Sequence, residues 1–173
     1  MYLPSNDRIK KKKINHYIEV LEMTDQKTLD PLLLENQLCF PVYACARKIV
    51  AAYNPFLKEL GLTYAQYITM MVLWEEKEIA MRDLGKRLYL DSGTLTPVLK
   101  KLEAMGYLKR FRNPQDERIL MASITEKGIA LRAEAEKVPY KMGKLINWKG
   151  ELFSKEEVEQ LKAQLYQIIQ ALE

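Results

Sequence analysis

The sequence predicts a mainly α-helical fold with one small β-hairpin, and three observations support this. Apolar residues recur at spacings of three and four over most of the chain after residue 30, the period of an amphipathic helix. Over residues 107–124 the period changes to two, as in paired strands. Hydrophobic residues make up 48% of the 173 positions, enough for the core of one domain.

The N-terminal part differs from the rest. Residues 1–30 have little helical periodicity and are interpreted as a mobile tail. Met23 opens a segment suited to a protein start, and the hypothesis that follows is that residues 1–22 are an upstream extension that the domain does not need. Residues 31–173 are expected to form the domain.

A first helix is predicted from Pro31, ending at Asn54-Pro55 or one turn later at Leu60-Gly61. Its apolar stripe comprises Leu34, Leu38, Val42, Ala46, Ile49 and Tyr53.

Three helices follow in the central region. Thr63 is a typical cap for a helix over Tyr64–Glu76, and a short helix is predicted over Met81–Leu88. A third helix is capped by Asp91 or Ser92 and ends at Gly106, although Pro97 favours a later start of its regular part. Short helix, tight turn and second helix form a helix-turn-helix.

A hairpin comes directly after this motif. Residues 107–112 and 117–124 alternate around a turn at 113–116, and the tip is polar and basic. A hairpin in this position is a wing, so we predict a winged helix-turn-helix over about 62–124. Thr125 then caps a helix to about Ile146, and Ser154 begins a capping box for a last helix. The flanking helices, about 31–60 and 125–172, are expected to form a dimer interface.

Charge and composition favour some classes of function and exclude others. The formal net charge is +4, and residues 79–118 carry nine basic and five acidic side chains, which equals that whole excess. Clustered Lys and Arg favour nucleic acid, although an ordinary solvated surface has the same composition. The single histidine excludes histidine triads and multi-histidine metal sites, so no enzyme, metal or cofactor is expected. Two cysteines six residues apart fit a reducing cytoplasm, and no membrane segment is predicted.

The third helix of the central region has a face suited to DNA. With Leu95 and Leu102 inward, a helical wheel leaves Thr94 at the side. The outward residues are Gly93, Thr96, Pro97, Lys100 and Lys101. Threonine and proline suit thymine methyl groups, and lysines suit phosphates or guanine. An ordinary polar helix face is the alternative interpretation.

The wing supplies further cations. Arg112 lies near the basic tip, and Arg118 is placed to enter a minor groove with Asp116 fixing its orientation. The alternative is a surface salt bridge between Asp116 and Arg118, worth under about 1 kcal/mol. The order of helix, helix and hairpin favours DNA binding.

The order of a long helix, a second helix, a helix-turn-helix, a wing with an Asp-x-Arg motif and two closing helices resembles that of the MarR-type winged-helix regulators over residues 31–172. Four motifs are similar to those of the organic hydroperoxide resistance repressors within that family. They are "LENQLCFPVYA" at Leu34–Ala44, "LTYAQY" at Leu62–Tyr67, "LYLDSGTLTPVLKKLE" at Leu88–Glu103 and "DER" at Asp116–Arg118.

The resemblance implies a homodimeric repressor that binds an inverted-repeat operator in double-stranded DNA when reduced and releases it when oxidised by an organic hydroperoxide. It assigns the reactive thiol to Cys39 and the tyrosines that hydrogen-bond its sulfur across the dimer to Tyr53 and Tyr64. The matching DNA-binding positions are Ser92, Thr94 and Thr96 on the helix and Arg118 on the wing. No cysteine follows Cys45, which favours the one-cysteine subclass, in which a low-molecular-weight thiol caps the oxidised sensor.

Physical chemistry is compatible with this role for Cys39. A thiol must ionise to react, and both a helix N-terminus and phenolic donors favour the thiolate. The alternative for Cys39 is a buried small hydrophobe. Cys45 lies about 240° around and about 9 Å along the same helix, so it is interpreted as structural. An apolar pocket for the peroxide is expected from Phe40, Tyr43, Tyr67 and Trp74, although core packing fits them equally.

Three other functions remain open. One is a MarR-type regulator that responds to a non-covalent small aromatic ligand. The others are a cysteine-based peroxidase and a purely structural dimerising module.

Overall fold

The computed structural model describes residues 30–146 and 153–173. The chain divides into two compact units, Met1–Lys48 and Ile49–Glu173, and each is described by itself. Except for Asp30, the predicted tail and the proposed start at Met23 lie outside the described residues. The domain boundaries expected from the sequence therefore stay predictions.

The first long helix begins later than the sequence predicts. A 3₁₀-helix, η1 (Leu34–Asn36), comes first, and Gln37 then has extended backbone angles. Helix α2 runs over Cys39–Glu59 rather than from Pro31. A helix from Pro31 would place Pro41 in its interior, where the missing N–H and the ring break the turn. A start at Cys39 places Pro41 in the first turn, where no intrahelical partner is needed.

The junction between α2 and α3 follows local signals. Helix α2 passes through Pro55, so the later of the two predicted ends is correct. Gly61 has φ +67°, the left-handed conformation of a glycine cap. Helix α3 (Tyr64–Glu76) has the predicted bounds and begins with a capping box between Thr63 and Gln66.

The predicted helix-turn-helix is formed by α4 (Met81–Leu88) and α5 (Ser92–Ala104). Pro97 lies inside α5 and does not delay its start. The reason is the Asp91 carboxylate, which accepts hydrogen bonds from the Thr94 N–H at 2.9 Å and the Thr94 hydroxyl at 2.8 Å. This cap stabilises the helix from Ser92 onward.

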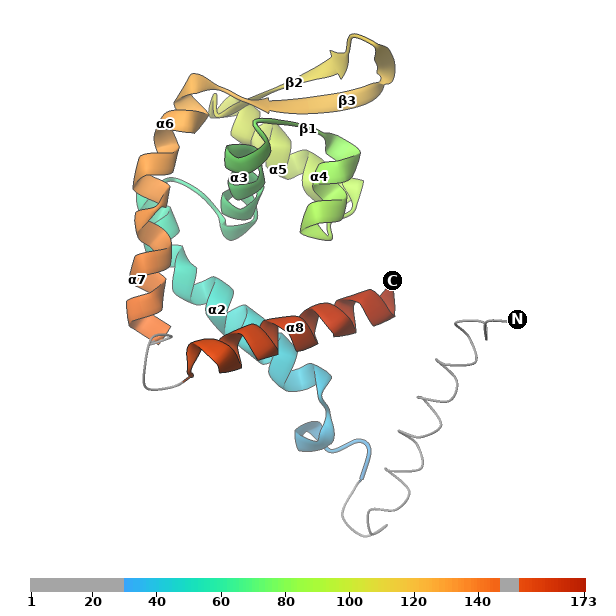
Figure 1. Ribbon diagram of the computed structural model, residues 1–173, viewed down its shortest axis with the longest axis vertical. Helices are drawn as coiled ribbons and strands as arrows, with labels where there is room; N and C mark the ends of the chain where they lie inside the picture. The colour runs from blue at the N-terminus through green and yellow to red at the C-terminus, as the bar shows by residue number, and fades with distance from the viewer. Residues whose placement is uncertain (1–29, 147–152) are drawn as a thin grey trace, which may run out of the picture. The chain divides into compact units, whose positions relative to one another are not determined.

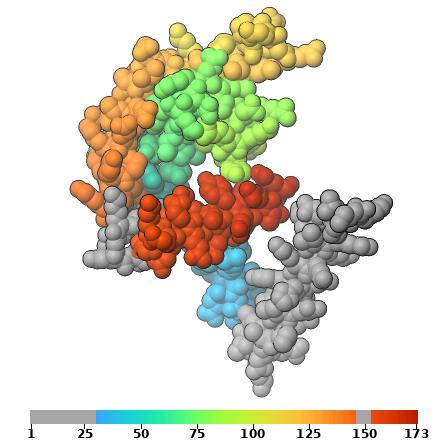
Figure 2. Space-filling view, viewed as in Figure 1, coloured from blue at the N-terminus to red at the C-terminus, as the bar shows by residue number. Residues whose placement is uncertain are grey.

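The wing is a hairpin of β2 (Leu108–Asn113) and β3 (Asp116–Ile124), as predicted, and its tip projects beyond the helices (Figures 1 and 2). A third strand, β1 (Glu78–Ala80), pairs with β3 in the antiparallel order β1-β3-β2. The sequence missed β1 because three residues are too few to show alternation.

The closing helices depart from the prediction at one point. Instead of one helix to Ile146, the chain forms α6 (Glu126–Ala135) and α7 (Lys137–Ile146). Pro139 explains the break, because its ring collides with the carbonyl four residues earlier, that of Ala135, and it has no N–H to bond there. Helix α8 (Lys155–Leu172) begins with the predicted Ser154 capping box.

The core of the second unit gathers the C-terminal part of α2, helices α3, α4 and α5, the sheet and α6–α7 around fully buried apolar side chains. These include Leu57, Met70, Leu73, Leu84, Leu99 and Leu102. The predicted mainly α fold with a winged helix-turn-helix is confirmed. Among the residues described, no helix has the length and apolar character of a membrane span.

Candidate nucleic-acid interface and sensor site

Helix α5 has the two faces that the helical wheel predicts. Leu95, Leu99 and Leu102 are at most 1% exposed and pack into the core. The opposite side is open to solvent except at Thr96, which is partly covered. Its exposed residues are Ser92, Gly93, Thr94, Pro97, Lys100 and Lys101.

Local hydrogen bonds already orient the hydroxyls on this face. The Thr94 hydroxyl donates to Asp91, and the Thr96 hydroxyl donates to the Ser92 carbonyl at 2.6 Å. Both oxygens keep lone pairs to accept bonds from base amino groups. The same bonds from Thr94 lower the pKa of Asp91, so this carboxylate stays charged near neutral pH.

The turn before α5 contains a residue that the sequence did not single out. Tyr89 caps α4 with φ 54° and ψ 38°, a left-handed conformation that costs energy for a non-glycine residue. Its side chain is exposed beside the N-terminus of α5. No sequence signal marked it, because this conformation is typical of Gly and Asn.

The wing residues are arranged differently from the expectation. The Asp116 carboxylate accepts a hydrogen bond from the Arg118 backbone N–H at 3.0 Å. No ion pair joins Asp116 to the Arg118 guanidinium within the described residues, so Asp116 shapes the turn and leaves that group unpaired. Arg112 donates to the Arg118 carbonyl at 3.4 Å. Both arginine side chains are exposed.

The structure also separates the basic residues of the 79–118 stretch into two groups. Lys86, Arg87 and Arg110 form ion pairs with Asp83, with Glu75 and Glu76, and with Glu103. The others make no ion pair within the described part of the chain. They are Arg82, Lys100, Lys101, Lys109, Arg112 and Arg118. These six are the cations available to an anionic partner, a distinction that a charge count does not make.

The sensor residues fall in both compact units. Cys39 is the first residue of α2, and its side chain and that of Cys45 are exposed. In the second unit, the rings of Tyr53 and Tyr64 meet edge to face with centroids 5.1 Å apart. Burial raises the pKa of both phenols, so they remain protonated donors at neutral pH. Contact between these phenols and the Cys39 thiol stays a prediction.

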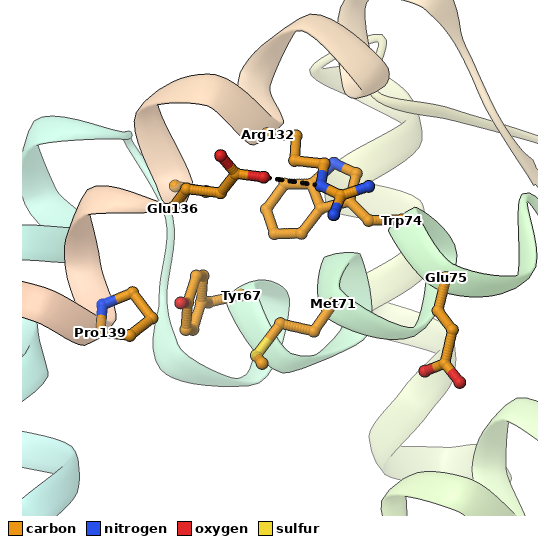
Figure 3. Close-up of a pocket in the computed structure, with 8 residues that line it drawn as sticks. Tyr67, Met71, Trp74, Glu75, Arg132, Glu136 and Pro139 are labelled. Atoms are coloured by element: carbon orange, nitrogen blue, oxygen red, sulfur yellow. Dashed lines mark hydrogen bonds and ion pairs between the residues drawn. The ribbon is translucent and has the colours of Figure 1, made fainter.

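A pocket of about 290 Å³ lies between α3 and the α6–α7 junction. Figure 3 shows Tyr67, Met71 and Trp74 from α3 facing Arg132, Glu136 and Pro139. The Arg132 Nε donates to the Glu136 carboxylate at 3.0 Å. Tyr67 and Trp74 thus line a pocket as expected. Phe40 and Tyr43 belong to the other unit and do not line it.

Across residues 30–146 and 153–173, no three or more His, Cys, Asp or Glu side chains gather into a possible metal site.

Comparison with known proteins identifies the family. The family model for the transcriptional regulator SarA/Rot matches residues 51–134. The organic hydroperoxide resistance transcriptional regulator of Bacillus subtilis is 40% identical over 147 residues, which cover 85% of this chain and 97% of that protein. This chain is a MarR-type winged-helix regulator. The regulator is therefore a transcription factor rather than an enzyme, as predicted.

Solved structures agree with the fold of the regulator. AbfR of Staphylococcus epidermidis is 34% identical with a TM-score of 0.65, covering 82% of this chain and 97% of that one. Reduced AbfR bound to DNA has a TM-score of 0.68 at 31% identity, over 83% and 96% of the two chains. Disulfide-formed AbfR has a TM-score of 0.57 at 32% identity, over 81% and 95%.

Proposed function

We propose that the regulator is a homodimeric repressor that binds an inverted-repeat DNA operator when reduced and releases it when an organic hydroperoxide oxidises Cys39. The observation that carries the proposal is the exposed Cys39 at the first position of α2. The chain is also similar to a hydroperoxide resistance regulator over 97% of the length of that relative. AbfR has been solved reduced and bound to DNA and also in a disulfide form, which supports DNA binding by a reduced relative and an oxidisable cysteine in it.

The DNA half rests on α5 and the wing. The exposed face of α5 enters the major groove, where Ser92, Thr94 and Thr96 contact base edges and Pro97 contacts apolar groups. Lys100 and Lys101 bind phosphates. Arg118 enters the adjacent minor groove, Arg112 supports it, and Asp116 shapes the turn that presents it.

The redox half is a balanced sequence of two reactions. The Cys39 thiolate attacks the outer oxygen of the hydroperoxide, the O–O bond breaks, and the alkoxide leaves as an alcohol after taking up a proton. The resulting sulfenic acid then reacts with a low-molecular-weight thiol, forming a mixed disulfide and water. Cys45 cannot replace this thiol, because six helical residues place it about 240° around the helix from Cys39.

The test is an operator gel shift with cumene hydroperoxide and cysteine as the small thiol. Wild type and Cys45→Ser are expected to release DNA on oxidation, and Cys39→Ser is expected to stay bound. Release of Cys39→Ser to the same extent would refute Cys39 as the sensor. Absence of binding by reduced wild type at low salt would refute the DNA half.

The pocket beside Trp74 supports a second candidate, a regulator that responds to a non-covalent aromatic ligand. Tyr67, Met71 and Trp74 provide an apolar wall, and Arg132 lies at its margin. Benzoate serves as the probe in the same gel shift. Release of both wild type and Cys39→Ser by benzoate, without peroxide, would favour this candidate over the redox sensor.

A further inference from the structure

Glu103 holds Arg110 by both its backbone and its side chain. One carboxylate oxygen, Oε1, accepts from the Arg110 N–H at 2.9 Å. The other, Oε2, accepts from Arg110 Nε at 2.9 Å and also from Nη2. The two side chains are 33% and 19% exposed, the lowest exposures of any ion pair in the described residues. Two guanidinium donors meet one carboxylate oxygen and the backbone N–H meets the other, so the carboxylate fixes the orientation of Arg110 as well as its distance.

This pair connects the two elements that the proposed function assigns to DNA. Glu103 lies in the last turn of α5, and Arg110 lies in β2. Arg110 pairs with Ala122 of β3 in the sheet, and Arg112 follows on the same face of β2 two residues later. The carboxylate therefore ties the C-terminal end of α5 to β2, the first strand of the wing.

Arg110 is poorly placed to bind DNA itself. Its Nε and Nη2 are already used by Glu103, and most of its side chain is covered. The connection between α5 and β2 also closes without the pair. Tyr107 N–H donates to the Leu102 carbonyl at 3.0 Å, and Leu102 and Leu108 are buried in the core. Loss of the pair is thus expected to leave the fold intact.

We propose that Glu103 and Arg110 are positioning residues that set the spacing between α5 and the wing, so that both contact DNA in one binding event. The inference rests on the proposed operator binding. A wing that is not held must be ordered on binding, and part of the binding free energy is lost to this ordering. Preorganisation by Glu103 removes that cost.

The possible roles of Glu103 predict different changes in DNA affinity when its carboxylate is removed. Removing a carboxylate near DNA raises the local positive charge, so a purely electrostatic role for Glu103 predicts tighter binding. The positioning role predicts weaker binding, by about tenfold, similar to the loss expected for removal of the wing arginine. A role in stability alone predicts a lower Tm with unchanged affinity well below that Tm.

The experiment measures operator affinity by fluorescence anisotropy for wild type, Glu103→Ala, Arg118→Ala and the double variant. We expect Glu103→Ala and Arg118→Ala each to weaken binding by about tenfold, and the double variant to bind about as weakly as Arg118→Ala alone. Glu103→Gln, which keeps an acceptor for the Arg110 N–H, is expected to lose less. Glu134→Ala is the charge-matched control. It also removes one carboxylate from an ion pair, but Glu134 lies in α6 and its exposed partner is Lys137 of α7.

Unchanged or tighter binding by Glu103→Ala would overturn the proposal, and so would fully additive losses in the double variant. If Glu103→Ala proves unfolded by circular dichroism, the comparison of Glu103→Gln with wild type decides by the same criteria. Failure of wild type to bind the operator would instead refute the proposed function, so the two failures are distinguishable.

Discussion

Tyr67 lies at the centre of an aromatic group that extends from α2 to α3. Its ring is 6.1 Å from Tyr53 and 6.3 Å from Trp74, measured between centroids, and its side chain is almost fully buried. Burial, reinforced by Tyr53 and Tyr64, raises the pKa of Tyr67 to about 12. The folded state therefore favours the neutral phenol, while an unfolded tyrosine ionises near pH 10.

This difference predicts alkaline destabilisation. Because the folded pKa is the higher one, the contribution of Tyr67 is complete below pH 10 and is lost as the pH rises from about 10 to 12. Between pH 9.5 and 11 the loss is about 1 kcal/mol. We expect the free energy of unfolding of Tyr67→Phe, measured in urea, to fall between pH 9.5 and 11 by about 1 kcal/mol less than that of wild type. Tyr140→Phe, an exposed control, should decline like wild type, and equal declines for Tyr67→Phe and wild type would contradict the prediction.

At the scale of elements, the first turn of α6 packs directly on the end of the turn that leads into β2. The Gly128 carbonyl accepts a hydrogen bond from Trp74 Nε1 at 2.8 Å, which joins α6 to α3. A Cβ on Gly128 would lie 2.2 Å from the Tyr107 carbonyl oxygen and 2.8 Å from Ile124 Cγ1. Backbone atoms cannot move aside without shifting a whole element.

Gly128→Ala is therefore expected to lower the free energy of unfolding by about 3 kcal/mol through overpacking. Gly143→Ala is the matched control, because nothing lies within 4 Å of its Cβ position in α7. There the substitution should raise stability by up to about 1 kcal/mol through helix propensity. Chemical denaturation compares the two. A cost below about 0.5 kcal/mol for Gly128→Ala would show that this contact relaxes freely.

At the scale of the molecule, α8 has an apolar face that the described residues of one chain leave uncovered. No residue of α8 is buried. The exposed positions Leu161, Leu165, Ile168 and Leu172 follow spacings of four, three and four, so they form one stripe. Such a stripe is typical of a protein interface, and dimers are typical of this family.

The stripe predicts that Leu165→Glu shifts the regulator from dimer to monomer at micromolar concentration, because a charge in an apolar interface is costly to desolvate. Sedimentation velocity provides the measurement. Gln167→Glu adds the same charge on the opposite side of α8 and should leave the dimer unchanged. A Leu165→Glu variant that sediments like wild type would exclude this face from the interface.

The sequence by itself determined the local structure. Thr63, Ser154 and the 3.6-residue period defined helix starts and buried faces, and the change to a two-residue period defined the hairpin. These features were predictable because each depends on residues within a few positions of one another, through capping bonds and side-chain alternation. The same local information placed the threonines and lysines on the open face of α5.

Only the tertiary structure decided the long-range partners. It paired β1 with β3, placed Tyr53 against Tyr64, engaged Arg110 with Glu103 and directed the Asp116 carboxylate to a backbone N–H. The spacing of residues along the chain does not identify these long-range partners. Each contact depends on how separate elements pack against one another and on which backbone N–H and C=O groups still need a hydrogen-bond partner after packing.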